Sequence, residues 1–191
     1  MTILMRKGGV ASKNEERNDI EVREFYNNFT PPRYARRLVV RLLSSVPAKY
    51  SRGIESVVLT NQSGAPRRQR LGKVTSRKRR LRQHGVLGRY YRAFSGKPAW
   101  IELYVDNLAQ AASYHPFLPM GRTACFGQVL FHEIGHHVHA TARPEFREKE
   151  DVADDWGKRL LRNYLLVHYW FVPRPVWKAI GWALKAIAAE L

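Results

Sequence analysis

The stretch that decides the fold is Phe131-His132-Glu133-Ile134-Gly135-His136-His137-Val138. His132 and His136 are four residues apart, so on a helix their imidazoles lie on one face, one turn apart. Two neutral imidazole nitrogens at this separation can share one zinc ion, and the carboxylate of Glu133 is placed to take a proton from metal-bound water. This is the HExxH arrangement. The alternative is a core helix with surface histidines, but apolar packing does not require two histidines and a glutamate, so we predict a metal site.

A catalytic zinc site normally has three protein ligands, and the acidic residues after Pro144 are the candidates for the third. They fall at the start of a second expected helix, where the helix dipole favours carboxylates. Helical phase puts two of them, Glu150 and Asp154, on a face that continues inward through Gly157, Leu161 and Leu165. Carboxylates on such a face require a cation or a hydrogen-bond donor. We therefore predict Glu150 as the third ligand, with Glu148 as the runner-up.

Other polar residues have possible supporting roles. Asp154 either holds the free N–H of a ligand histidine or forms a surface salt bridge. His137 and His139 are expected to face a ligand, the substrate or solvent, because one straight helix does not easily close three ligands around one ion. An oxyanion formed during hydrolysis needs a donor besides the metal, and the sequence does not choose among four candidates: His139, Tyr114, His115 and Tyr164.

These residues resemble the zincin metallopeptidases, and more narrowly the gluzincins. In that group a second helix follows the HExxH helix and carries a glutamate ligand and, four residues later, an aspartate, as Glu150 and Asp154 are placed here. The order of elements from Arg33 to His168 also resembles the compact ImmA/IrrE-like and minimal gluzincin cores. The resemblance implies an α+β, zincin-like fold in which a small, mostly antiparallel sheet packs on the HExxH helix and the glutamate helix.

The resemblance also implies an activity, that of a zinc metallopeptidase of the endopeptidase type. Glu133 would assist the attack of zinc-bound water on a peptide bond, and His132, His136 and Glu150 would hold the Zn²⁺. The substrate would be a peptide or protein bound along a sheet edge formed by residues 86–94 or 100–105. The alternative function is a non-catalytic basic protein that binds nucleic acid or another partner and keeps a zincin fold around a structural zinc.

The chain divides into three predicted parts. Residues 1–30 are polar and are expected to form a flexible N-terminal arm, with a possible short helix around 19–26. Residues 31–172 form the zincin-like domain, with a helix after Pro32 and strands at 54–60, 86–94 and 100–105. Residues 173–191 are predicted to form an amphipathic helix packed on the domain, the alternative being a helix that lies in a membrane surface.

Charge is the other prominent feature of the 191 residues. There are 33 basic and 16 acidic residues, a net charge of +17, which attracts polyanions. The basic loop at 64–85 is expected to be either a solvated hairpin or a contact for nucleic acid or another polyanion, through Arg67, Arg68, Arg70, Lys73, Arg77, Lys78, Arg79, Arg80 and Arg82.

The sequence also bears on the compartment. The lone cysteine, Cys125, excludes a disulfide within the chain and is expected to be a packing residue. We expect no signal peptide, because no apolar region follows the basic N-terminal residues. No uninterrupted apolar run reaches transmembrane length. We therefore expect a cytoplasmic protein.

Overall fold

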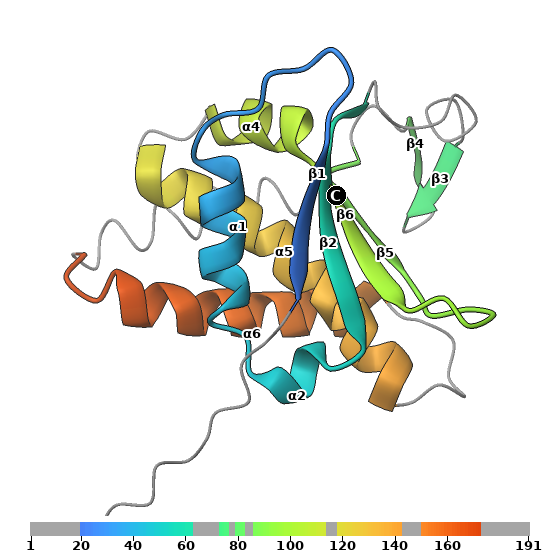
Figure 1. Cartoon of the computed structure of the whole chain (residues 1–191). Coiled ribbons are helices and arrows are strands. Elements are labelled where there is room, and N and C mark those ends of the chain that lie inside the picture. The colour runs from blue at the N-terminus through green and yellow to red at the C-terminus, as the bar shows by residue number, and fades with distance from the viewer. Residues whose placement is uncertain are drawn as a thin grey trace, which may run out of the picture.

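The computed structural model describes residues 20–62, 73–76, 79–82, 86–113, 118–142 and 150–172 (Figure 1). The protein belongs to the α+β class. Its elements in chain order are β1 (Glu21–Phe25), α1 (Ala35–Leu43), α2 (Ala48–Ser51), β2 (Ile54–Thr60), β3 (Lys73–Ser76), β4 (Arg79–Arg82), β5 (Gly88–Tyr91), β6 (Ala99–Tyr104), α4 (Val105–Ser113), α5 (Leu118–Ala142) and α6 (Glu150–His168).

The main sheet is small and mixed, so the prediction of a mostly antiparallel sheet is wrong. Its strand order is β1-β2-β6-β5, in which β1 pairs with β2 and β2 with β6 in parallel, whereas β6 pairs with β5 in antiparallel fashion. The chain passes through α1 and α2 between β1 and β2, and a crossover of this kind returns the second strand in the same direction as the first. The parallel pairing therefore follows from a first strand that the sequence analysis did not predict.

That first strand replaces the short helix considered for residues 19–26. Val22 pairs with Val57, and Phe25 with Thr60, along the edge of β2. The segment carries charges at Glu21, Arg23 and Glu24, which is common for an edge strand but gives little periodic signal in the sequence. Residues 20–30 thus belong to the folded domain, and the rest of the predicted arm lies outside the described residues.

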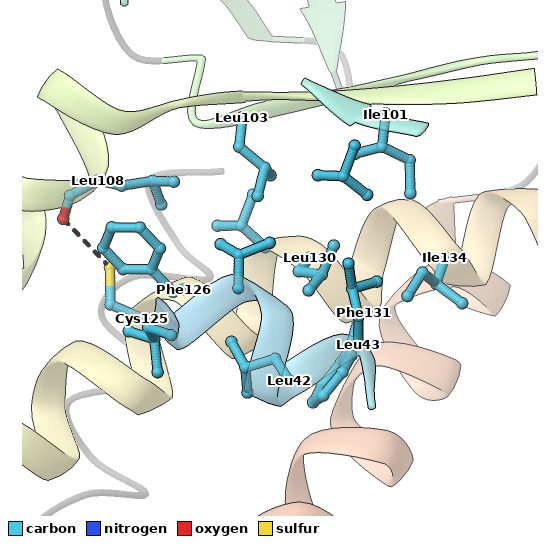
Figure 2. Close-up of a cluster of buried hydrophobic side chains, with 14 of the residues drawn as sticks. Leu42, Leu43, Ile101, Leu103, Leu108, Cys125, Phe126, Leu130, Phe131 and Ile134 are labelled. Carbon is cyan, nitrogen blue, oxygen red and sulfur yellow. Dashed lines mark hydrogen bonds between the residues drawn. The ribbon is translucent and has the colours of Figure 1, made fainter. Parts of the chain in front are cut away.

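The core lies between the sheet and the helices (Figure 2). Ile101 and Leu103 alternate along β6 and are fully buried, as their spacing predicted. The predicted apolar stripe of α1 is also buried, and both elements pack on α5 through its side chains Phe126, Leu130, Phe131 and Ile134.

Cys125 is a packing residue, as predicted. It is fully buried, and its thiol donates a weak hydrogen bond to the carbonyl oxygen of Leu108 at 3.7 Å (Figure 2). Burial raises the pKa of this thiol to about 12, so it stays protonated at neutral pH. It is also separate from the group of potential metal ligands described below.

Glycines allow α5 and α6 to lie close together in an antiparallel arrangement. A Cβ placed on Gly135 would lie 2.6 Å from the backbone oxygen of Ala153, and one on Gly157 would lie 3.1 Å from the backbone nitrogen of His132. Both distances are shorter than ordinary van der Waals contacts to backbone, which cannot move aside as a side chain can. The two glycines therefore set how closely the start of α6 approaches His132.

The far end of α6 and the residues that directly follow it are apolar and partly exposed. Val167, Trp170 and Phe171 expose 70%, 79% and 65% of their surface, although Leu165 is buried. The helix predicted for residues 173–191 lies outside the described residues. Among the helices that the structure describes, none has both the length and the apolar character needed to cross a membrane.

Replacing Gly135 by alanine is expected to lower the free energy of unfolding by about 1–3 kcal/mol, because the new methyl group must displace the backbone of α6. Gly127→Ala is the matched control on the same helix. Its Cβ would meet the end of the Leu161 side chain at 2.9 Å, which can rotate away. The higher helix propensity of alanine, worth about 1 kcal/mol, then offsets most of the cost. Urea unfolding measures both variants, and equal stabilities would contradict the close-packing argument.

Candidate metal centre

Two of the predicted ligands lie one turn apart on α5. The Nε2 atoms of His132 and His136 are 3.0 Å from each other, and their rings meet at nearly a right angle. Both side chains are largely shielded from solvent, with 13% and 11% of their side-chain surface exposed. The HExxH helix thus places both imidazole nitrogens at one point.

The third predicted ligand, Glu150, is the first residue of α6. Its Oε2 atom lies 3.4 Å from His132 Nε2 and 3.6 Å from His136 Nε2. Interaction with the neighbouring imidazoles of His132 and His136 holds the pKa of the Glu150 carboxyl far below its usual range, so it is a carboxylate at neutral pH. The structure therefore brings together the three side chains that the sequence analysis selected, and this group could hold a metal ion.

The separations suit a small tetrahedral ion. Zinc binds imidazole nitrogen and carboxylate oxygen at about 2.0–2.2 Å, and tetrahedral angles then place the ligand atoms about 3.3–3.6 Å apart. The three separations observed are 3.0, 3.4 and 3.6 Å. Shifts of a few tenths of an ångström in the three ligand atoms would place them at three corners of a tetrahedron around one ion. A nitrogen and oxygen donor set of this kind is the one that zinc commonly takes in catalytic sites.

Asp154 lies behind His132, on the side where it must lie to hold the free N–H of this histidine, the first of its two predicted roles. Its Oδ1 atom is 3.0 Å from His132 Nδ1, the ring nitrogen that does not face the other ligand atoms. The two atoms are at ion-pair distance, but the N–H does not point straight at the oxygen, so the contact is not a well-formed hydrogen bond. A carboxylate at this position fixes the tautomer in which Nε2 has a free lone pair.

Glu133 lies beside the group but is not part of it. The side chain is buried, and this burial raises the pKa of its carboxyl, while the nearby His132 and His136 and the backbone N–H of Tyr90 act to lower it. The carboxylate reaches β5 closely: a Cβ placed on Gly88 would lie 3.1 Å from Glu133 Oε1. Gly88 and Tyr90 are site residues that the sequence analysis missed, since only the fold shows that β5 crosses this part of α5.

His137 has a structural role that the sequence analysis did not foresee. It is buried, and its Nε2 atom lies 3.0 Å from the carbonyl oxygen of Arg52, to which it donates a hydrogen bond. Its Nδ1 atom is then free to accept the hydrogen bond of the Tyr90 hydroxyl, at 3.0 Å. Desolvation lowers the pKa of His137, which favours this neutral form. Through these two hydrogen bonds, His137 connects β5 and the loop before β2 to the HExxH helix.

The four candidate oxyanion donors have different outcomes. Tyr164 lies 14 residues after Glu150, about 21 Å along α6, and stacks on His168, so it is not among the side chains that the structure brings together, and its role stays a prediction. His139 is buried on α5, and its proposed role stays a prediction. Tyr114 and His115 lie outside the described residues, as does the runner-up ligand Glu148.

The basic segment is described in part. Lys73–Ser76 pairs with Arg79–Arg82 as an antiparallel two-stranded sheet, so the predicted hairpin is present in the backbone. Of the nine basic residues proposed for polyanion contact, four belong to these strands. The other five, which are Arg67, Arg68, Arg70, Arg77 and Lys78, lie outside the described residues. Polyanion binding by this segment stays a prediction.

Comparison with protein-family models, with curated proteins and with solved structures gave no match. The likeness to zincins therefore rests on the residues quoted above and on no relative. The α+β class and the group of potential ligands are features of the structure itself.

Asp154→Asn is expected to weaken Zn²⁺ binding by about 10- to 100-fold, because the amide keeps the shape of the side chain but loses the charge that fixes the His132 tautomer. Asp155→Asn is the matched control, since Asp155 is the next residue of the same helix, points about 100° away from Asp154 and is exposed. Competition with a chromogenic chelator gives the Zn²⁺ dissociation constant of each variant. Equal constants for the two variants would contradict the assignment.

Proposed function

We propose that the protein is a zinc-dependent metallopeptidase. The observation that carries the proposal is the convergence of His132 Nε2, His136 Nε2 and Glu150 Oε2 at separations suited to one tetrahedral ion, with Glu133 beside them. Three protein ligands leave the fourth corner of a tetrahedron open, which is the pattern of catalytic rather than structural zinc sites. The carboxylate that is not a ligand has no role in a purely structural site.

His132, His136 and Glu150 would hold the zinc, and Asp154 would orient His132. When bound, the ion supplies a Lewis acid that acidifies water and polarises a carbonyl group. The chain contributes a rigid frame for these ligands, because the close contact of α5 and α6 fixes Glu150 against the two imidazoles. Small shifts in ligand position are costly in such sites, and this packing limits them.

Glu133 would be the general base and then the general acid. Its carboxylate accepts a proton from the attacking water and passes that proton to the nitrogen of the leaving amine, so the peptide bond is broken without net change at Glu133. Burial raises the pKa of the carboxyl towards the working pH, which suits a group that must both take and give a proton. The backbone N–H of Tyr90 holds the carboxylate in place.

Strand β5 is the favoured place for the substrate backbone. Within the described part of the sheet it is an edge strand, paired with β6 alone, and Tyr90 of this strand contacts Glu133 through its backbone N–H. An extended peptide that adds to such an edge pairs its backbone with the strand. Its scissile bond would then lie next to the general base. The endopeptidase activity expected from the sequence is consistent with a strand that has no second partner strand within the described residues.

The alternative is a non-catalytic basic protein with a structural zinc, which binds nucleic acid or another polyanion through residues 67–82. The high positive charge favours this reading, whereas the buried Glu133 carboxylate, held beside the ligands, favours the peptidase. The two proposals differ in whether the zinc-loaded protein cleaves peptide bonds, so activity decides between them.

We expect the purified protein to contain about one zinc ion per chain, and Glu150→Ala to lose it, because two imidazoles alone hold zinc weakly. Asp155→Ala removes an exposed carboxylate from the next turn of α6 and is expected to keep the zinc. Inductively coupled plasma mass spectrometry on dialysed protein measures the content. Zinc retained in Glu150→Ala would refute this ligand set.

Glu133→Gln is expected to keep the zinc and to lose at least 100-fold in peptidase rate, since the amide has the size of the carboxylate but cannot accept the proton. The release of new amino groups from an unfolded protein substrate measures the rate. Cleavage by this variant at the wild-type rate would refute the mechanism. A zinc-loaded wild type that cleaves nothing would support the structural alternative.

A further inference from the structure

A hollow lies away from the metal centre, between α1 and the start of α5. Its volume is about 400 Å³, and its walls come from both helices, which lie against each other in the fold (Figure 1). Thr123 of this hollow is nine residues before His132, about 14 Å along α5. The hollow is therefore distinct from the proposed active site and is not needed for its chemistry.

Three arginines line the hollow, namely Arg37 and Arg41 on α1 and Arg122 on α5. Within the part of the chain that the structure describes, no carboxylate lies at ion-pair distance from any of them. Their neighbour Arg36, by contrast, points elsewhere and lies 3.5 Å from a Glu24 oxygen. Three like charges around one hollow repel one another unless an anion lies between them.

The remaining walls add to this preference. Arg122 lies over the ring of Tyr34, with its guanidinium carbon 4.5 Å from the ring centroid, so the aromatic face holds this cation in position. Pro119, Arg122 and Thr123 belong to the first turns of α5, a helix of 25 residues. The N-terminal end of a helix carries a partial positive charge, which adds to the preference for an anion. Leu38 and Pro119 supply apolar surface between the charged groups.

We propose that this hollow binds a phosphate group. Guanidinium forks pair with phosphate oxygens through two parallel hydrogen bonds, and a doubly charged group meets three cations better than a single carboxylate does. The phosphate belongs either to a soluble compound or to the headgroup of a lipid. The exposed Trp170 and Phe171 follow Tyr169, whose hydroxyl lies 2.9 Å from Thr123 Oγ1, so a lipid surface could reach the hollow.

Isothermal titration with inorganic phosphate at low ionic strength tests the site on the full chain. We expect saturable binding by the wild type, a dissociation constant at least tenfold higher for Arg37→Ala and for Arg122→Gln, and a change of less than twofold for Arg36→Ala. Arg36 is the matched control, because it is an exposed arginine of the same helix outside the hollow. Arg37 is exposed, so its variant is expected to fold, and the urea midpoint checks this.

Cosedimentation with vesicles identifies the source of the phosphate. One set contains phosphatidylcholine with phosphatidic acid and the other phosphatidylcholine alone. Binding to the first set that weakens at least tenfold in Arg37→Ala, but not in Arg36→Ala, assigns a lipid headgroup. Binding of inorganic phosphate with the same dependence and no vesicle binding assigns a soluble compound. Absence of binding in both experiments, or equal losses in the Arg36 and Arg37 variants, would overturn the proposal.

Discussion

The close contact between α5 and α6 is the constraint on which the candidate metal centre depends. Two histidines come from one helix and the carboxylate from the other, so their separation follows from the distance between the helix axes. Gly135 against Ala153 and Gly157 against His132 make that distance short. A larger side chain at either glycine would move Glu150 away from the imidazoles, although neither glycine is itself a metal ligand.

Much of this arrangement could be predicted from local periodicity. The four-residue spacing of His132 and His136 and the helical phase of Glu150 and Asp154 are properties of single helices, and the structure brings these four side chains together. The apolar stripes of α1 and β6 were equally readable, because burial on one face leaves a period in the sequence.

Other features depend on pairings between distant segments and left no such signal. β1 is short and charged, and its parallel partner lies beyond a helix, so the mixed sheet was not foreseen. His137 and Tyr90 are 47 residues apart, and their hydrogen bond exists only because β5 crosses α5. Tyr164 is a candidate donor by residue type alone, whereas its distance along α6 separates it from Glu150.

The edge strand β1 has a consequence for how the protein behaves outside its native state. It covers the backbone N–H and C=O groups along one side of β2, whose side chains Val57 and Leu59 are fully buried. A chain that lost this strand would present an uncovered, apolar template to other copies of itself. Its charges at Glu21, Arg23 and Glu24 discourage further strands from adding to the outer side. By covering this side of β2, β1 is expected to limit self-association and fibre formation.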